Sequence, residues 1–178
     1  MIIFMGVAGA GKSLQGKHLG DNHGYPWIST GEMLRLMITD ERRKQMLKGK
    51  LFSDTEMIEL VDKTLGMIDI SKEFLLDGFP RTIAQAEWVM SQVKAGRLKM
   101  TAVINFEADY EVVIERLLKR GRLDDTEEVI KKRFSDYHKY TVPIIEYLKK
   151  EGVVVHDIDA DQPPEKIYEQ MHVLLHGE

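Results

Sequence analysis

The sequence predicts an α/β protein of the doubly wound type, with three layers (α/β/α) and a five-stranded parallel sheet. Five short apolar runs alternate with longer segments of helical pattern. The runs are mostly apolar and do not alternate with polar residues, which is typical of strands buried on both faces. The length of 178 residues suits one domain, and we find no linker or repeat. We therefore expect a single domain over residues 1–178.

The five apolar runs, each bounded by turn residues or charges, are the expected strands. They are Ile2 to Met5, Trp27 to Ser29, Phe74 to Asp77, Ala102 to Phe106 and Val153 to Ile158. Parallel strands joined by right-handed crossovers have all their carboxyl ends along one edge of the sheet, where ligands bind. Residues that directly follow a run are therefore candidates for function.

The segments between the runs carry helical signals. Tyr110 to Lys119 has apolar residues three and four apart, as in a helix buried along one side. Asp125 to Lys150 is predicted as one long helix or a pair, with Pro143 beginning or bending the second part because proline lacks an N–H donor. Further helices are expected at Ser13 to Leu19, Thr82 to Val93 and Pro164 to Leu175.

Residues 30–69 interrupt the alternation of strands and helices. They contain apolar residues at helical spacing, among them Met33, Leu34 and Met37, but no apolar strand. We predict a helical insertion over the edge of the sheet.

The composition excludes several classes of protein. A chain with 43% hydrophobic and 30% charged residues is not disordered, and its net charge of -4 argues against nucleic-acid binding. No stretch approaches the roughly 18 apolar residues of a membrane span. The apolar start lacks the basic residues of a secretory signal, so we expect a cytoplasmic protein. The absence of cysteine excludes disulfides, thiol nucleophiles and zinc bound by cysteines, and we expect no zinc cofactor.

Residues 6–13, directly after the first run, have the sequence GVAGAGKS and match the phosphate-binding pattern G-x-x-x-x-G-K-[ST]. Glycines let successive backbone N–H groups point at one phosphate, and Lys12 adds a charge that reaches the β and γ phosphates. The Ser13 hydroxyl can serve a magnesium ion. The alternative is a glycine-rich turn with an exposed lysine, which the strand and helix around the motif disfavour. Leu14 breaks the glycine pattern of dinucleotide-binding folds.

A second group of polar residues follows the second and third runs. Asp77 ends the third run, beside which the P-loop strand is expected, and is placed to hold Mg²⁺ through water. Arg81 follows a stiff Gly-Phe-Pro turn, and its planar guanidinium suits two phosphate oxygens. Gln85 can both donate to and accept from the edge of a base. Thr30 is either a nucleobase contact or a helix N-cap.

These motifs resemble adenylate kinase and the wider nucleoside monophosphate kinase family, in order and over essentially the whole chain. The resemblance rests on the P-loop, Ser29 to Arg35, Gly49 to Leu51, Asp77 to Gln85 and Arg116 to Arg133. The Asp-Gly-Phe-Pro-Arg string beside a P-loop is highly specific. It implies reversible transfer of the γ-phosphoryl group of ATP to AMP, giving two ADP, by a monomer that uses Mg²⁺ and no covalent intermediate.

The resemblance also implies the roles of individual residues. The catalytic set is Lys12, Asp77, Arg81, Arg120, Arg122 and Arg133. The ATP-binding set is Gly6, Gly9, Ala10, Gly11, Lys12, Ser13, Leu14, Arg116, Arg120 and Gln162. The AMP-binding set is Thr30, Gly31, Arg35, Lys50, Leu51, Phe52, Gly78, Phe79, Pro80, Arg81, Gln85, Arg122 and Arg133. Ser13 and Asp77 are the expected magnesium residues, and residues 30–69 are the expected nucleoside monophosphate-binding insertion.

The arginines are concentrated in the matching motifs, whereas the lysines mostly lie elsewhere in the sequence. Six of the nine arginines lie in the matching segments. By resemblance, Arg116 packs against the adenine of ATP, Arg120 contacts its phosphates, and Arg122 and Arg133 clamp the transferred group. Asp124 is expected to steady an arginine. The alternative for the basic residues 119–122 is a solvated helix end.

Two departures from the family pattern affect particular residues. Ala8 stands where most relatives have proline, and Ser13-Leu14 stands where they have Gly-Thr, so Leu14 can contribute only its backbone N–H. The mobile lid of the family is reduced here to residues 120–125, which predicts less lid motion and a wetter site.

Thr30, Thr82 and Gln85 are the residues typical of relatives that act on AMP, where UMP and CMP kinases have other residues. Two rival functions stay open: a kinase for UMP, CMP or another monophosphate, and a nucleotide-binding regulatory protein without turnover. His172 and His176 are one helical turn apart and can share a metal, but no third ligand is evident, so a solvated helix face is the better interpretation.

Overall fold

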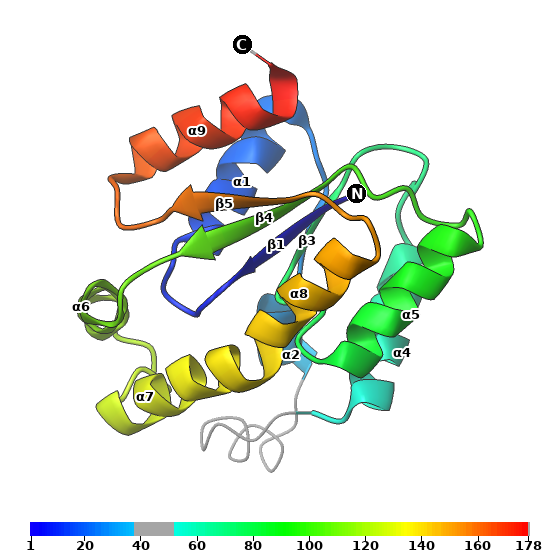
Figure 1. Cartoon of the computed structure of the whole chain (residues 1–178). Coiled ribbons are helices and arrows are strands. Elements are labelled where there is room, and N and C mark those ends of the chain that lie inside the picture. The colour runs from blue at the N-terminus through cyan, green and yellow to red at the C-terminus, as the bar shows by residue number, and fades with distance from the viewer. Residues whose placement is uncertain (38–51, 178) are drawn as a thin grey trace.

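The computed structural model describes residues 1–37 and 52–177. Its centre is a sheet of five parallel strands in the order β2-β3-β1-β4-β5, which confirms the predicted fold class (Figure 1). The strands are β1 (Ile2–Gly6), β2 (Trp27–Ser29), β3 (Leu75–Asp77), β4 (Ala102–Glu107) and β5 (Val155–Asp159).

Strand β1 is buried on both faces, which is why its sequence is continuously apolar. Ile3 and Met5 belong to one core cluster, and Ile2 and Phe4 to the other. At the end of the strand, Gly6 has a φ of 132°, and a Cβ atom there would lie 2.6 Å from the carbonyl oxygen of Phe106 in β4. Glycine is thus required where the P-loop leaves the sheet.

The two core clusters are the two faces of the sheet, and each face is covered by helices. One face carries α4 (Asp54–Leu65), α5 (Ile83–Lys94) and α8 (Val142–Lys150). The other carries α1 (Lys12–His23), α6 (Tyr110–Arg120), α7 (Glu127–Asp136) and α9 (Pro164–His176). In Figure 1, α1 and α9 lie on one side of the strands and α5 and α8 on the other.

The strand order creates a switch point next to β1. Helix α1 leaves β1 toward one face, and α5 leaves the neighbouring strand β3 toward the opposite face. The loops after these two paired strands therefore diverge, which opens a crevice at their carboxyl ends. The P-loop and Asp77 begin at this crevice.

The segment from Asp125 to Lys150 forms a pair of helices joined by a π-helical turn, Tyr137–Thr141. Thr126 caps α7 by accepting a hydrogen bond from the Val129 N–H at 3.4 Å. Pro143 is the second residue of α8, as the sequence predicts. Because proline has no N–H to donate four residues back, the turn before it widens, and the Val142 N–H bonds to Tyr137 O instead.

Between β2 and β3, the described residues form α2 (Thr30–Met37) and α4 and contain no strand, which agrees with the helical pattern of residues 30–69. Lys50 and Leu51 lie outside the described residues. Gly121 ends α6 with a left-handed φ of 66°, and α7 begins at Glu127, so the connection between these helices is short. Among the helices of the described ranges, none has the length and apolar character needed to cross a membrane.

Candidate active site

A cavity of about 400 Å³ lies at the carboxyl ends of the strands. It is lined by residues from the P-loop, α2, the turn after β3 and the α6–α7 region, segments far apart in the sequence. The predicted site residues that line it are Gly6, Gly9, Gly11, Lys12, Ser13, Leu14, Thr30, Gly31, Arg35, Phe52, Asp77, Gly78, Pro80, Arg81, Gln85, Arg116, Arg120, Arg122 and Arg133. The structure thus brings most of the predicted residues together.

Of the predicted residues that the structure describes, three do not line the cavity. Ala10 is fully buried in the core, and the Phe79 ring packs edge-on against Trp88 with 5.9 Å between ring centroids. Gln162 lies after β5, and its Nε2 donates to Asp159 Oδ2 at 2.8 Å. The side chains of Ala10 and Phe79 are therefore structural here, and only their backbone groups can serve a ligand.

The Lys12 ammonium lies over the P-loop. Its Nζ donates to the carbonyl oxygens of Gly6 at 2.6 Å and Val7 at 2.7 Å, which uses two of its three donors. Burial of the ammonium group lowers the pKa of Lys12 to about 8. The charge of Asp77 opposes this shift, and the charge of Arg81 adds to it by a smaller amount. A phosphate at the loop would supply an anionic partner for this ammonium group.

Ser13 and Asp77, the two expected magnesium residues, are in contact. Ser13 Oγ donates to Asp77 Oδ2 at 3.3 Å, and Asp77 is buried at the end of β3. A hydroxyl and a carboxylate are hard oxygen donors of the kind Mg²⁺ prefers, so the residues present fit this ion. Leu14 lines the same cavity, but its N–H donates to Gly11 O at 3.0 Å, which does not favour the phosphate contact expected of it.

The turn after β3 is locked to α2. Thr30 Oγ1 donates to Gly78 O at 2.9 Å, and Arg81 Nε donates to the same oxygen at 2.8 Å. Gly78 has a φ of +81°, and a Cβ atom there would lie 2.7 Å from Thr30 Oγ1. Of the two interpretations of Thr30, the N-cap is wrong: its hydroxyl donates to a carbonyl, and Ser29 Oγ lies 3.5 Å from the Glu32 N–H in the capping position.

Gln85 is buried and holds three segments together. Its Oε1 accepts from the Arg81 N–H at 2.8 Å, and its Nε2 donates to Asp54 Oδ1 at 2.8 Å. Thr82 Oγ1 donates to the same carboxylate oxygen at 2.7 Å, while Thr82 caps α5. The Gln85 amide still has one N–H and one lone pair for a base.

Two arginines of the α6–α7 region, Arg120 and Arg133, are held by aspartates. Arg120 forms a two-pronged pair with Asp125, through Nε at 2.9 Å and Nη2 at 2.7 Å. Arg133 pairs with Asp124 and also reaches Asp125 Oδ1 at 3.5 Å. Burial by itself raises the pKa of Asp124. The hydrogen bond and the charge interaction with Arg133 outweigh burial, so the pKa lies below its usual value. Asp124 steadies an arginine, as the sequence suggests.

Glu32 joins the two sides of the cavity. Its Oε1 accepts from Arg35 Nη2 at 2.8 Å and from Arg122 Nη2 at 2.9 Å. The hydrogen bond from Arg35 is the main cause that lowers the pKa of Glu32, with burial opposing it and the charges of both arginines adding to it. One carboxylate thus fixes an arginine of α2 next to an arginine of the α6–α7 connection.

Arg116 is directed toward the loop after β5. Its Nη1 donates to Ala160 O at 2.6 Å, and its Nη2 lies 3.3 Å from the carbonyl oxygens of Asp161 and Gln162. These contacts hold the guanidinium at the edge of the cavity, with its planar face available for stacking. The predicted adenine contact of Arg116 stays a prediction.

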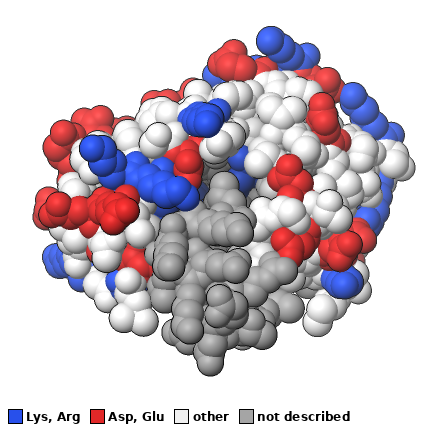
Figure 2. Space-filling view, turned by 90° about the horizontal axis from the view of Figure 1, so that it is seen from below, with Lys and Arg blue, Asp and Glu red and all other residues white. Residues whose placement is uncertain are grey.

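Sequence reasoning missed some residues of the site. Asp54 acts through partners that are distant in the chain, and so does the contact of Glu32 with Arg122, although the Glu32–Arg35 pair has the i,i+3 spacing of a helix. The π-helical turn directs its segment inward, so that the cavity is also lined by Tyr137, Tyr140 and Thr141. The sequence signal that could have indicated this turn is Pro143. On the face seen in Figure 2, acidic and basic side chains are interleaved, which is why the net charge of -4 gives no hint of a cationic cavity.

The arrangement is chemically suited to hold a polyphosphate. One cavity is lined by the P-loop lysine, the Ser13–Asp77 pair and five arginines, with Arg116 at its edge. Four of these arginines, Arg35, Arg120, Arg122 and Arg133, form ion pairs with nearby carboxylates. Cations that are held in place by carboxylates stabilise charge that develops during phosphoryl transfer without having to be reoriented.

Comparisons with known proteins show which family this chain is related to. A family model described as adenylate kinase matches residues 4–153. The chain is similar to adenylate kinase 1 of Synechocystis, with 36% identity that covers 98% of this chain and 96% of the relative. It is 38% identical to the adenylate kinase of Corynebacterium urealyticum over 94% of both chains, and 32% identical to that of Archaeoglobus fulgidus over 98% and 97%. The chain therefore belongs to the adenylate kinase family.

Proposed function

We propose that this chain transfers the γ-phosphoryl group of ATP to AMP, reversibly, in one in-line step. The observation that carries the proposal is that a single cavity joins the P-loop to the Arg81 turn and is lined by Lys12 and arginines. Phosphoryl transfer requires alignment of the two substrates and stabilisation of negative charge more than covalent chemistry by the protein. A cavity of this composition meets both needs.

The donor half of the cavity is assigned to ATP. The P-loop backbone and Lys12 bind its β and γ phosphates, and Arg120 contacts the same phosphates. Arg116, at the cavity edge, stacks on the adenine. The support for this assignment is the position of these groups around the end of β1 and α6.

The acceptor half is assigned to AMP. Arg35 and Arg81 bind its phosphate, because both line the cavity on the α2 side and each guanidinium can bind two oxygens at once. Gln85 pairs with the adenine edge through its remaining N–H and lone pair. Residues 30–69 are the AMP-binding insertion in this proposal, with Lys50 to Phe52 near the base.

Arg122 and Arg133 are assigned to the transferred phosphoryl group. Both are held by carboxylates, Arg122 by Glu32 and Arg133 by Asp124. Each guanidinium has five N–H donors, so a fixed pair with one carboxylate leaves others for the phosphoryl oxygens. Residues 120–125 form the short lid over this group.

Ser13 and Asp77 would hold the Mg²⁺ that accompanies ATP, directly or through water. When bound, the ion neutralises charge on the β and γ phosphates. Asp77 orients Ser13 through their hydrogen bond. We further propose that the chain works as a monomer in the cytoplasm, where ATP and AMP are available.

The test is a coupled assay of the purified chain with ATP and a panel of monophosphates. We expect AMP to be used with the highest kcat/KM. ADP should be formed both from ATP and from AMP. Equal or higher efficiency with UMP or CMP would replace the proposal by a kinase for pyrimidine monophosphates. Absence of turnover with all monophosphates, with ATP still bound, would leave a regulatory nucleotide-binding protein.

A bisubstrate inhibitor, with two adenosines joined by a phosphate chain, tests the geometry. It should raise the melting temperature more than ATP and AMP together, because one molecule fills both halves of the cavity. Stabilisation no greater than by ATP alone would mean that the acceptor half is elsewhere.

A further inference from the structure

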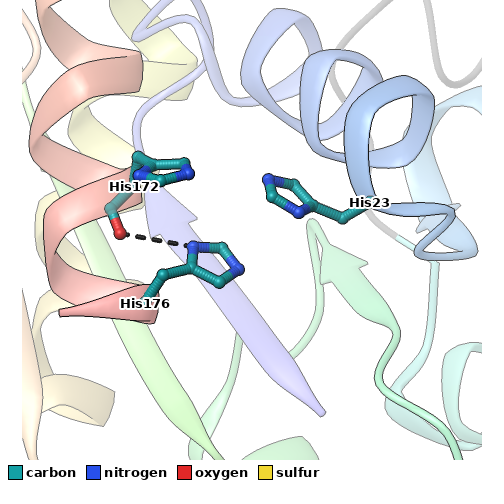
Figure 3. A group of neighbouring side chains, drawn as sticks. All are labelled: His23, His172 and His176. Carbon is teal, nitrogen blue, oxygen red and sulfur yellow. Dashed lines mark hydrogen bonds between the residues drawn. The ribbon is translucent and has the colours of Figure 1, made fainter. Parts of the chain in front are cut away.

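Three histidines meet between the first and the last helix. His23 is the last residue of α1, and His172 and His176 lie one turn apart near the end of α9. A ring nitrogen of each lies within 4.8 Å of those of the other two. Figure 3 shows the ring of His23 facing the rings of His172 and His176 across the space between the two helices. The fold thus places next to His172 and His176 a third imidazole that the sequence did not indicate.

This convergence is specific within the structure. Among residues 1–37 and 52–177, it is the one group of three or more His, Asp or Glu side chains placed closely enough to hold a metal ion. It lies on the α1–α9 face, and none of its members lines the active-site cavity. The cluster therefore has no part in the proposed phosphoryl transfer.

The packing around the rings keeps them close. The His23 and His176 rings are stacked at 4.4 Å between centroids, and Tyr25 stacks on His23 at 5.5 Å. Hydroxyl groups also lie near, with Tyr168 Oη 3.4 Å from His23 Nε2 and Tyr25 Oη 3.4 Å from His176 Nε2.

The distances suit a metal ion bound by three imidazoles after small side-chain rotations. In a tetrahedral zinc site each nitrogen lies about 2.0–2.1 Å from the ion, so the nitrogens are about 3.4 Å apart. The three rings must therefore approach by at most about 1.4 Å. His176 is exposed at the end of α9 and His172 is half-buried, so their rings can turn without moving the core.

We propose that His23, His172 and His176 form a binding site for a divalent transition metal ion of the zinc type. Three neutral imidazoles suit Zn²⁺, and also Ni²⁺ or Cu²⁺, whereas Mg²⁺ prefers oxygen ligands. The site is thus distinct from the Mg²⁺ that accompanies ATP. The earlier expectation of no zinc came from the absence of cysteine, which does not exclude a site made of histidines alone.

The ion would tie two distant parts of the chain together. Helix α1 begins at the P-loop, and α9 is the last helix, so the site closes a loop that contains most of the sequence. An ion that binds the folded chain and not the unfolded one raises its stability in proportion to the logarithm of the ion concentration. The expected consequence is a rise in melting temperature, without a direct role in turnover.

The test uses the untagged full-length chain, stripped of metal and free of nucleotide. Its melting temperature is measured against increasing Zn²⁺, with Mg²⁺ as a separate series. We expect Zn²⁺ to raise the melting temperature by several degrees and Mg²⁺ to leave it unchanged. Binding of Co²⁺, followed by its visible absorption bands, reports directly whether imidazoles coordinate the ion.

The variants are His23→Gln and His176→Gln, with His138→Gln as the matched control because His138 is an exposed histidine outside the cluster. Each cluster variant should lose at least tenfold in Zn²⁺ affinity and the Co²⁺ bands, while its metal-free melting temperature stays close to that of the unmodified chain. The control should bind as the unmodified chain does. Equal Zn²⁺ binding by all four proteins, or none by the unmodified chain, would overturn the proposal.

Discussion

Glu32 Oε1 accepts a hydrogen bond from Arg122 Nη2 at 2.9 Å, although the two residues are 90 positions apart in the sequence. The same oxygen accepts from Arg35, so helix α2 and the α6–α7 connection share one carboxylate. Exposed ion pairs contribute little to stability, typically about 0–1 kcal/mol. The value of this contact is in orientation, since two flexible guanidinium groups are held at the cavity before a phosphate arrives.

Glu32→Gln should therefore affect catalysis more than stability. Without the carboxylate, Arg35 and Arg122 lose their common anchor and must be ordered when AMP binds. We expect kcat/KM for AMP to fall by about 3- to 10-fold, equivalent to about 0.7–1.4 kcal/mol. Steady-state kinetics with AMP varied at saturating ATP measures this. Glu59→Gln, an exposed glutamate of α4, is the control; equal kinetics of the two variants would contradict the orienting role.

Arg81→Ala should reduce turnover by orders of magnitude. A single arginine that contacts the phosphates of a phosphoryl-transfer site is worth about 10³- to 10⁵-fold in kcat. Thermal unfolding of the variant should remain cooperative, because Arg81 lies in the open cavity. Arg97→Ala is the matched control, since Arg97 pairs with Asp62 on the surface, outside the cavity. A loss of less than tenfold for Arg81→Ala would remove this residue from the site.

The lowered pKa of Lys12, about 8, makes ATP binding sensitive to pH. The charged ammonium binds phosphate, and bound phosphate raises its pKa, so affinity is highest below pH 8 and falls as the pH rises above it. Binding should take up about a tenth of a proton at pH 7 and about nine-tenths at pH 9. Calorimetry of ATP binding in buffers of different ionisation enthalpy measures this uptake. Lys12→Arg, always protonated, should abolish it; persistent uptake in that variant would assign the proton to another group.

The contact between Ser13 and Asp77 predicts a shared effect on Mg²⁺. Asp77→Asn removes the charge that would hold the ion, and Ser13→Ala removes the hydroxyl. We expect both to raise the Mg²⁺ concentration needed for half-maximal rate, with the larger effect from Asp77→Asn because charge dominates at this site. A titration of Mg²⁺ at fixed ATP compares them, with Ser13→Thr as the variant that keeps the hydroxyl. Unchanged Mg²⁺ dependence in Asp77→Asn would exclude the pair as a magnesium site.

Local pattern was sufficient for the motifs and for the central strands, whereas β5 lies at the edge of the sheet, spans Val155–Asp159 instead of Val153 to Ile158, and is not buried on both faces as expected. The run Ile2 to Met5 predicts a central strand because both of its faces must be apolar, and β1 is buried on both faces. Pro143 marks the start of α8 because its missing N–H acts within one turn. The P-loop is likewise a contiguous string whose function depends on neighbouring backbone groups.

Hydrogen-bond partners across the chain were not predictable in the same way. The role of Thr30 depended on whether a carbonyl or an N–H lies next to its hydroxyl, and the carbonyl belongs to Gly78. Gln85 was expected at a base edge, but its amide also holds Asp54 and the Arg81 N–H. Such pairs depend on how two distant segments pack, and either partner is chemically able to bond elsewhere.

What the sequence by itself determined is the type of sheet, the P-loop and the arginine-rich character of the site, because each follows from residue type and spacing over a few positions. Only the tertiary structure decided which side chains of the site pair with one another. Glu32 joins Arg35 of its own helix to the distant Arg122, and His23 of the first helix joins His172 and His176 of the last. The physical reason is that such contacts form only after the helices have packed on the sheet.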